Sequence, residues 1–391
     1  MTPLPPLVEP GDELTAAEIA RYSRHLIMPD VGTLGQRRLK NARVLVMGGG
    51  GLGSPTLLYL AAAGVGTLGI VDFDVVDESN LQRQIIHGVA DVGRLKTDSA
   101  ADAIAAVNPS VRVQRHDVQL TSENAVDLFS GYDLIVDGTD NFATRYLVND
   151  AAALAGKPYV WGSIFRFDGQ VSVFWEAAPD DRGLNYRDLY PQPPPAGLVP
   201  SCAEGGVLGL LCGTIGSLMG TEAVKLICGI GDTLLGRLLI YDALRMTMRT
   251  VRFGRDPQRR PITGLIDYEA FCGIGNDDEP VIDAADALSP QQLAEELAGP
   301  APPVLIDVRE AVEFEIVALP GARLIPSGDI TSGARLGEIP HQERVVLYCK
   351  TGIRSAQALA ALRRAGLGQV VHLAGGIAAW GRDVDPDLPM Y

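Results

Sequence analysis

Cys349 and Arg354 lie in the short segment VLYCKTGIRSAQA, residues 346–358, and their types and spacing could support sulfur chemistry. The cysteine ends an apolar, strand-like run, four residues separate it from the arginine, and a helix-like run follows. Such a loop would curl its backbone N–H groups around one sulfur at a helix N-terminus, where a thiolate and a terminal persulfide are stabilised. The pattern therefore predicts a nucleophile at Cys349, and the alternative is a strand end without chemistry.

A second chemical pattern is the glycine-rich segment VLVMGGGGLGSP, in which Gly48, Gly50 and Gly53 directly follow an apolar strand. Glycine allows a tight turn and a close approach of the backbone to phosphates. Asp72 ends the next strand and could bind ribose hydroxyls. The pattern predicts a nucleotide site and suits NAD as well as ATP, while a glycine turn needed for packing alone is the alternative.

Donors and cations downstream favour a triphosphate. DESNLQRQ supplies Asn80, Gln82 and Arg83, and Lys96 follows in GRLK. Because the chain has no Walker lysine motif, the positive charge for the phosphates must come from these residues. A solvated charged surface is the alternative for the same residues.

Asp140 and Asn141 follow a later strand in DGTDNFATR. Open α/β sheets bind ligands at the carboxyl ends of their strands, so Asp140 could hold a magnesium ion there. The alternative is that Asp140 caps the next helix.

The elements that must position these residues alternate along the chain. Apolar strand-like runs from ARVLVMG to GQVSVFWE, residues 42–176, alternate with helix-like runs. This alternation predicts βαβ units and an α/β fold with a doubly wound, largely parallel, Rossmann-like sheet covered by helices. A proline-rich loop follows over residues 176–201, too long for a simple connector.

The chain is predicted to divide into a flexible N-terminal arm (1–11), a large nucleotide-binding domain (12–275), an acidic linker (276–287) and a smaller α/β domain (288–391). The smaller domain starts a new alternation with VLIDVRE, RVVLYCK and QVVHLAG. A chain of 391 residues is long enough for cores of this number and size.

Composition excludes some classes of function. The net charge of −15 argues against nucleic acid or an anionic membrane as the main partner. The five cysteines are odd in number and irregularly spaced, and no signal peptide precedes them, which predicts reduced thiols in the cytoplasm. The longest uncharged run, residues 205–221, is interrupted by glycines and predicts a buried helix rather than a membrane span.

Several motifs in order resemble the MoeB/ThiF family, the bacterial relatives of ubiquitin-activating enzymes. These motifs are RYSRHLIMPDVG, VMGGGGLGSP, VDFDVVDESNLQRQ, LKTDSA, DGTDNFATRYLVND and PSCAEGGVLG, within residues 12–275. Residues 288–391 resemble a rhodanese domain, and the fusion resembles the MoeZ type of adenylyltransferase/sulfurtransferase.

The resemblance implies an ATP-dependent reaction. The C-terminal Gly-Gly carboxylate of a ubiquitin-like sulfur carrier attacks the α-phosphate of ATP, and sulfur then replaces AMP to give a thiocarboxylate. Carried over by position, the ATP site is lined by Gly51, Asp72, Ser79, Asn80, Leu81, Gln82, Arg83, Lys96, Asp140 and Asn141. The resemblance further implies Mg²⁺ at Asp140 and a homodimer in which Arg24 completes the partner's site. Fixed cations and magnesium would stabilise the negative charge that develops on the phosphate, with Arg83 and Lys96 as the catalytic cations.

Two further positions follow from the resemblance. Cys202, in PSCAEGG, stands where relatives carry a cysteine proposed to form a covalent link, with a buried structural cysteine as the alternative. Many family members also bind zinc through two CxxC pairs. Here Asn185 and Asp188 occupy the first pair and GRDPQRR, residues 254–260, has no cysteine, so no zinc is expected.

In the rhodanese-like domain, Asp307, Arg309 and Trp380 fit the family pattern as structural residues. Cys349 is the expected persulfide carrier, held by the loop residues Lys350, Thr351, Gly352, Ile353 and Arg354. Its outer sulfur would attack the acyl-adenylate, and a second thiol, Cys202 or an external reductant, would release the thiocarboxylate.

The sequence leaves open whether the donor is thiosulfate or a cysteine desulfurase, and whether the carrier serves molybdopterin biosynthesis, cysteine biosynthesis or another pathway. Two rival functions also stay open. One is an NAD-dependent oxidoreductase fused to a rhodanese domain, and the other is a non-catalytic nucleotide sensor with Cys349 as a redox switch.

Overall fold

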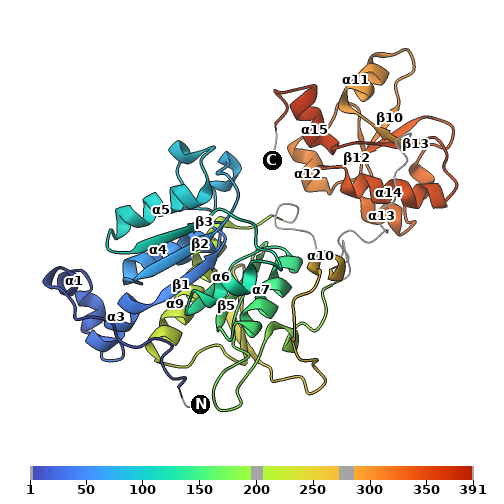
Figure 1. The fold of residues 1–391 in the computed structure, drawn as a ribbon. Helices are drawn as coiled ribbons and strands as arrows, with labels where there is room; N and C mark the ends of the chain where they lie inside the picture. Colours follow the sequence, from blue (N-terminus) through green and yellow to red (C-terminus); the bar gives the residue numbers. More distant parts are fainter. Residues whose placement is uncertain (1–2, 195–205, 273–285, 390–391) are drawn as a thin grey trace. The chain divides into compact units, whose positions relative to one another are not determined.

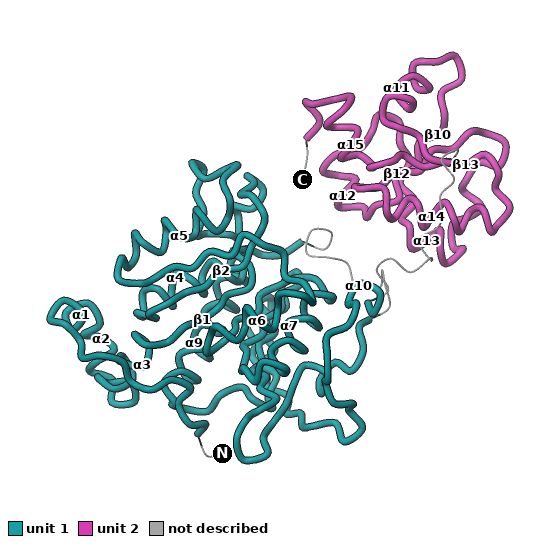
Figure 2. The backbone as a smooth tube through the Cα atoms, in the orientation of Figure 1, with its two compact units in different colours: residues 1–274 teal, residues 275–391 magenta. Residues whose placement is uncertain are grey.

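The computed structural model describes residues 3–194, 206–272 and 286–389. The chain divides into two compact units, residues 1–274 and residues 275–391, which Figure 2 shows in different colours. Each unit has its own sheet and its own hydrophobic core. Cys202 and residues 276–285 of the predicted linker lie outside the described residues.

Unit 1 is built on an eight-stranded sheet with the order β3-β2-β1-β4-β5-β6-β7-β8 (Figure 1). Its strands are β1 (Arg43–Met47), β2 (Thr67–Val71), β3 (Arg112–His116), β4 (Leu134–Asp137), β5 (Tyr159–Phe165), β6 (Asp168–Phe174), β7 (Arg237–Asp242) and β8 (Thr247–Arg252). Strands β3 to β5 pair in parallel, and β5 to β8 pair antiparallel. The predicted doubly wound, largely parallel sheet is confirmed, with an antiparallel extension at one edge.

Helices cover both faces of this sheet, as the ribbon in Figure 1 shows. The helices are α1 (Ala16–Arg21), α2 (Ser23–Leu26), α3 (Gly32–Asn41), α4 (Gly53–Ala63), α5 (Lys96–Val107), α6 (Ala125–Ser130), α7 (Phe142–Leu154), α9 (Gly209–Cys228) and α10 (Tyr268–Phe271). The core on one face includes residues of α3, α4, α5 and α9, and the core on the other includes residues of α6, α7 and α10. Side chains of β1 alternate between them: Val44 and Val46 face the first core, and Leu45 and Met47 the second.

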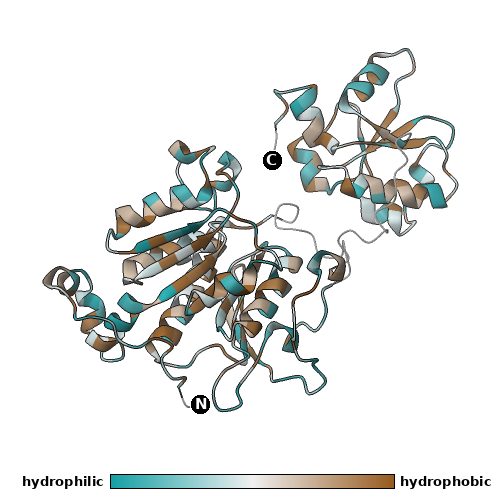
Figure 3. Cartoon of the chain, in the orientation of Figure 1, coloured by the Kyte–Doolittle hydropathy of each residue, from teal (hydrophilic) through white to brown (hydrophobic). Residues whose placement is uncertain are grey.

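Helix α9 is the buried helix that the uncharged run predicts. By length and composition it could cross a membrane, yet Leu211, Ile215, Met219 and Leu226 are buried in the core of unit 1. The hydropathy colouring of Figure 3 shows the hydrophobic strands of the sheet in the same unit. Burial against α4 and the sheet accounts for the apolar composition of α9.

The described part of the N-terminal arm, residues 3–11, is packed against unit 1 rather than free of it. Leu4 and Val8 are buried, and the backbone N–H of Leu7 donates to the carbonyl of Leu226, 3.1 Å away. The proline content suggested mobility, but the two apolar side chains bind this extended segment to the core. We therefore correct the expectation of a flexible arm for these residues.

Unit 2 has a five-stranded parallel sheet with the order β11-β10-β12-β13-β9. Its strands are β9 (Ala287–Leu288), β10 (Val304–Asp307), β11 (Arg323–Leu324), β12 (Val345–Tyr348) and β13 (Val370–Leu373), and its helices are α11 (Pro290–Ala298), α12 (Ala311–Ile316), α13 (Ser327–Thr331), α14 (Ile353–Arg364) and α15 (Gly376–Asp383). Asp307 and Arg309 form a fully buried ion pair, and Arg309 also donates to the carbonyl of Val317. Trp380 is buried in the same unit, which fits the structural roles expected for these three residues.

A cluster of ion pairs connects the two segments in which the sequence departs from the zinc-binding pattern. Asp188 and Arg259, both almost fully buried, pair with 2.8 Å between Oδ1 and Nε. Arg259 also pairs with Glu176 at 2.9 Å, and Asn185 donates to Glu176 through Nδ2. Charged and amide side chains thus join the segment of Asn185 and Asp188 to the segment of Arg259, the two segments that carry the zinc-binding cysteines in many relatives. The absence of zinc stays a prediction.

We expect the substitution Arg259→Ala to destabilise unit 1 by about 3 kcal/mol, because it leaves the carboxylate of Asp188 buried without its counter-charge. The free energy of unfolding should be measured by denaturant titration. Arg255→Ala is the matched control, since Arg255 is exposed and lies 3.9 Å from Glu176, and it should cost less than about 1 kcal/mol. Equal losses for the two variants would contradict the role given to Arg259.

Candidate functional site

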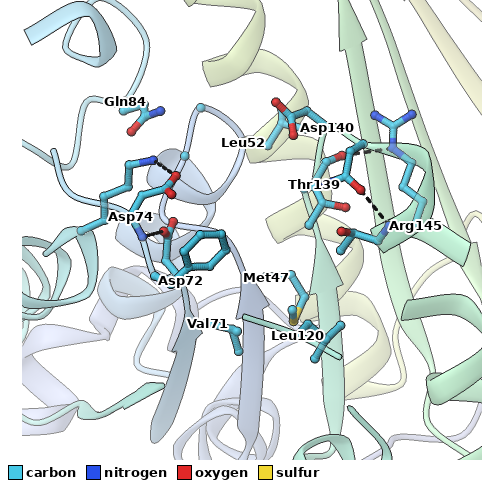
Figure 4. A pocket seen from close by; sticks show the side chains of 18 of the residues that line it. Met47, Leu52, Val71, Asp72, Asp74, Gln84, Leu120, Thr139, Asp140 and Arg145 are labelled. Atoms are coloured by element: carbon cyan, nitrogen blue, oxygen red, sulfur yellow. Dashed lines mark hydrogen bonds and ion pairs between the residues drawn. The ribbon is translucent and has the colours of Figure 1, made fainter. Parts of the chain in front are cut away.

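A cavity of about 350 Å³ opens in unit 1 at the carboxyl ends of β1, β2 and β4 (Figure 4). It lies where β1 has β2 on one side and β4 on the other, so consecutive connections leave the sheet in opposite directions. Such a switch point is the usual ligand site of an open α/β sheet. Of the predicted ATP-site residues, the cavity is lined by Gly51, Asp72, Arg83, Lys96, Asp140 and Asn141.

The glycine-rich loop between β1 and α4 forms the floor of this cavity. Gly48 has a φ of +86°, a conformation that residues with side chains rarely adopt. A Cβ atom at Gly53 would lie 1.9 Å from the carbonyl oxygen of Gly48, so the loop and the helix can approach this closely only with glycine there. The sequence pattern is thereby explained by backbone geometry.

The buried side chains of Asp72 and His87 hold the glycine-rich loop in place. The backbone N–H of Gly49 donates to Oδ2 of Asp72 at 2.8 Å, and Nε2 of His87 lies 3.1 Å from the carbonyl oxygen of Gly49. Burial lowers the pKa of His87, which favours a neutral ring whose Nε2–H donates to that carbonyl. His87 is not among the residues predicted for the site, because a histidine inside an apolar run carries no motif of its own.

Asp72, which was predicted to bind ribose hydroxyls, has a second contact with the backbone. Its Oδ1 accepts the backbone N–H of Asp74 at 2.9 Å, so both carboxylate oxygens are engaged with the backbone. Carboxylate oxygens can accept more than one hydrogen bond, so a contact with ribose stays a prediction. The first role of Asp72 in this structure is to join the glycine loop to the end of β2.

The cations of the cavity come from the segment after β2 and from the start of α5. Lys96 is buried, and its Nζ lies 2.8 Å from Oδ2 of the more exposed Asp74. Arg83 is half-buried and donates to the carbonyl of Ser79 at 3.0 Å. Both cations line the cavity, and Asp74 is a lining carboxylate that the sequence analysis did not single out.

Residues 79–82, predicted to contact ATP, do not line the cavity of this structure, whereas the neighbouring Arg83 does. Asp77 caps the short 3₁₀ helix Glu78–Asn80, and the carbonyl of Asn80 accepts the N–H of Arg83. The carbonyls of Ser79 and Asn80 therefore hold Arg83. Direct contacts of Ser79, Asn80, Leu81 and Gln82 with ATP stay predictions. Arg24, in α2, is exposed and likewise does not line this cavity.

On the opposite side of the cavity, Asp140 and Asn141 follow β4. Asn141 caps α7, accepting the N–H of Thr144 on Oδ1 at 2.8 Å, so the cap is the asparagine and not Asp140. The carboxylate of Asp140 is exposed at the cavity. One carboxylate beside bound phosphates is a common arrangement for magnesium, and these residues fit such an ion.

Arg145 is a third lining cation that the sequence analysis missed. Its Nε donates to the carbonyl of Thr139 at 3.1 Å, and its guanidinium lies 5.3 Å and 5.8 Å from the ring centres of Phe142 and Trp161. Figure 4 shows Arg145 and Asp140 on one side of the cavity and Asp72 and Asp74 on the other. The sequence could have indicated Arg145 by its position, because it lies in the first turn of the helix that follows the end of β4 at the ligand site.

The second candidate site lies in unit 2 at the end of β12, the central strand of its sheet. The backbone N–H of Gly352 donates to Sγ of Cys349 at 3.1 Å, and Gly352 has a φ of +99°. The N–H groups of Ile377 and Ala378, at the start of α15, donate to the carbonyls of Cys349 and Lys350. The loop thus presents an amide to the sulfur, as the sequence predicts, while the cysteine side chain is buried.

Arg354 closes this loop through an ion pair with a neighbouring helix. Its two terminal nitrogens lie 2.6 Å and 2.8 Å from the carboxylate oxygens of Glu313 in α12. A bidentate pair of this kind fixes both partners. The charge of Arg354 is thus balanced by Glu313, and the backbone N–H of Gly352 donates to the sulfur.

We expect Lys96→Ala to weaken the binding of ATP by about 10- to 100-fold, because a charged donor to the phosphates is lost. Isothermal titration calorimetry of the full chain measures this change. Arg94→Ala is the control, since Arg94 is exposed and pairs with Asp91 and Asp102 instead of lining the cavity. An unchanged affinity of Lys96→Ala for ATP would show that Lys96 does not contact the nucleotide.

Comparisons with known proteins match a family to each of the two units. The ThiF family model matches residues 22–261, and the rhodanese-like domain model matches residues 289–383. The chain is 64% identical over 390 residues to the probable adenylyltransferase/sulfurtransferase MoeZ of Mycobacterium tuberculosis, with 100% of both chains covered. It is 52% identical over 268 residues to a sulfur carrier protein adenylyltransferase of Thermus thermophilus, covering 66% of this chain and 98% of that protein.

More distant relatives extend these matches. The adenylyltransferase and sulfurtransferase MOCS3 of Drosophila grimshawi is 40% identical over 397 residues, covering 97% of this chain and 87% of that protein. Among solved structures, E. coli MccB with succinimide superposes with a TM-score of 0.54 at 19% identity, covering 63% of this chain and 74% of that one, which supports the fold alone. The chain belongs to the ThiF family and carries a rhodanese-like domain after its family domain.

Proposed function

We infer that this chain is an adenylyltransferase/sulfurtransferase that activates the C-terminal carboxylate of a ubiquitin-like sulfur carrier with ATP and then converts it to a thiocarboxylate. The inference depends on the combination of two sites in one chain. Unit 1 has a cavity at the strand ends, lined by a glycine loop and cations, and unit 2 has a cysteine whose sulfur accepts a backbone N–H. A relative named as a probable adenylyltransferase/sulfurtransferase is 64% identical over the full length.

In the first step, a carboxylate oxygen of the carrier attacks the α-phosphorus of ATP. The new P–O bond forms as the bond to the bridging oxygen breaks, and the electron pair leaves with pyrophosphate. The carboxylate is already ionised at neutral pH, so no general base is needed. Arg83 and Lys96 stabilise the charge that develops on the phosphate oxygens.

Magnesium is the proposed companion of ATP. Asp140 would hold the ion, which would supply further positive charge to the phosphates. Support comes from the exposed carboxylate of Asp140 at the cavity and from Asn141, which caps α7 beside it.

In the second step, the terminal sulfur of the Cys349 persulfide attacks the acyl carbon, and AMP leaves with the electron pair of the C–O bond. The product is an acyl disulfide on Cys349. A second thiolate then attacks the Sγ of Cys349, which forms a new disulfide and releases the thiocarboxylate. Cys202 or an external thiol reductant would supply that thiolate.

A homodimer with Arg24 acting in trans is the proposed assembly. Arg24 is exposed and does not line the cavity of its own chain. Ile27, Met28 and Leu34 expose apolar surface close to it in sequence, which fits a contact between two copies.

The proposed sulfur donor is thiosulfate or a cysteine desulfurase, and the proposed carrier serves molybdopterin or cysteine biosynthesis. A cytoplasmic location is also proposed. Among the described cysteines, the thiols of Cys228, Cys272 and Cys349 are compatible with a reducing compartment.

We expect the protein to catalyse exchange between ATP and radiolabelled pyrophosphate only when a carrier ending in Gly-Gly is present. The carboxylate is the nucleophile, so a carrier lacking its last two residues should give background exchange. The filter-bound label measures the rate. Carrier-independent exchange, or no exchange together with NAD binding, would contradict adenylation and favour a sensor or an oxidoreductase.

We expect Cys349→Ser to abolish thiocarboxylate formation while the ATP–pyrophosphate exchange keeps the wild-type rate. The serine hydroxyl cannot carry a sulfane sulfur, and the adenylation cavity lies in the other unit. Intact-mass spectrometry of the carrier measures the product, and Cys272→Ser is a buried-cysteine control. Full thiocarboxylate yield with Cys349→Ser would assign sulfur delivery to another group.

A further inference from the structure

A buried row of three side chains runs from Cys349 through Ser355 to His372. The Sγ of Cys349 lies 3.7 Å from Oγ of Ser355, and that Oγ lies 3.3 Å from Nδ1 of His372. The three residues are exposed by only 1%, 0% and 6%. At this burial, hydrogen bonds within the row are protected from competing water.

The hydroxyl proton of Ser355 can point toward any of several acceptors, and its direction decides whether Ser355 donates to the sulfur. The hydroxyl has one proton and three acceptors within reach: Sγ of Cys349, the carbonyl oxygen of Gly352 at 2.9 Å, and Nδ1 of His372 when that nitrogen carries no hydrogen. If Nδ1 carries a hydrogen, it donates to Oγ, and the hydroxyl proton must point elsewhere. A negatively charged sulfur is then the stronger acceptor.

Donation from His372 to Ser355 requires a hydrogen on Nδ1, the ring nitrogen 3.3 Å from Oγ of Ser355. Burial lowers the pKa of His372, while the carbonyl of Gly352, which accepts a ring N–H, and the negative charge of Asp286 act in the opposite direction. Asp286 is itself paired with Arg363. A carbonyl can only accept, so the ring nitrogen bonded to it is a donor.

We propose that His372 is a positioning residue that orients the hydroxyl of Ser355 toward the sulfur of Cys349, so that Ser355 joins the Gly352 N–H as a donor to the thiolate. The proposal rests on the sulfurtransferase function inferred above and adds two residues to it. Ser355 touches the reacting sulfur, and His372 acts through Ser355.

The proposed contact serves the step that loads the sulfur. The thiolate of Cys349 attacks the sulfane sulfur of the donor, a new S–S bond forms, and the old bond breaks with its electron pair leaving on the donor group, sulfite in the case of thiosulfate. A second hydrogen bond to Sγ stabilises the negative charge of the attacking thiolate.

The test is the pH dependence of Cys349 alkylation in the full-length protein. Iodoacetamide modification is followed on the Cys349 peptide by mass spectrometry, which separates it from the other cysteines. Ser355→Ala should raise the pH midpoint of alkylation by about one unit, a tenfold loss of thiolate at a given pH below the midpoint. His372→Phe, which keeps a ring without nitrogen, should raise it by about half a unit or more.

Two further variants distinguish positioning from a merely structural role. His372→Asn should keep the wild-type midpoint, since its amide N–H can replace Nδ1–H, and His341→Phe, at an exposed site, should also change nothing. The double variant Ser355→Ala with His372→Phe should match Ser355→Ala alone. If His372→Phe does not fold, His372→Leu takes its place in the cycle.

The proposal is overturned if folded His372→Phe keeps the wild-type midpoint, or if its shift adds in full to that of Ser355→Ala. The assay uses neither ATP nor carrier, so its outcome is independent of the adenylation reaction. Failure of carrier-dependent exchange would contradict the proposed function without affecting the alkylation result. An unchanged alkylation midpoint in the variants would contradict the role of His372 without affecting the evidence for adenylation.

Discussion

The hydrogen bonds of Asp72 are the constraint on which the nucleotide site depends. One carboxylate oxygen accepts the N–H of Gly49 and the other accepts the N–H of Asp74, so a single side chain joins the loop after β1 to the loop after β2. Asp74 in turn pairs with Lys96 at the start of α5. The position of Lys96 and the shape of the glycine loop are therefore coupled through the carboxylate of Asp72, and a shift of either would strain or break a charged hydrogen bond.

Both candidate sites use a loop between a strand end and a helix start, but they stabilise negative charge differently. In unit 1 the cavity is open and lined by Arg83, Lys96 and Arg145, which suits a large, multiply charged ligand. In unit 2 the sulfur is buried and accepts the N–H of Gly352, Oγ of Ser355 lies 3.7 Å from it, and Glu313 pairs with Arg354. The difference in donors matches the difference between a triphosphate and a single sulfur atom.

The sequence predicted the strands, the glycine loop and the cysteine loop, because these follow from local periodicity and from the conformational freedom of glycine. It also placed six ATP-site residues that do line the cavity. It missed Asp74, His87 and Arg145, whose roles arise only when three strand ends meet. Ser355 and His372 are separated by 17 residues and meet only because β13 pairs with β12, a relation that spacing alone does not give.

The N-terminal arm and the segments that depart from the zinc-binding pattern also depend on contacts that local sequence does not predict. Proline content suggested a mobile arm, while burial of Leu4 and Val8 decides its position. The loss of cysteines was readable from the sequence, but the replacement by Arg259, Asp188 and Glu176 required the fold, because these residues come from distant segments.

The central claim is that the sulfur carried by Cys349 becomes the sulfur of the product. The most direct measurement loads the protein with isotopically heavy sulfane sulfur, removes the free donor, and adds ATP, carrier and a thiol reductant for a single turnover. The account predicts that intact-mass spectrometry finds the heavy sulfur in the carrier thiocarboxylate and that the label is lost from the Cys349 peptide in equal amount. Heavy sulfur that stays on Cys349 while unlabelled thiocarboxylate forms would contradict it.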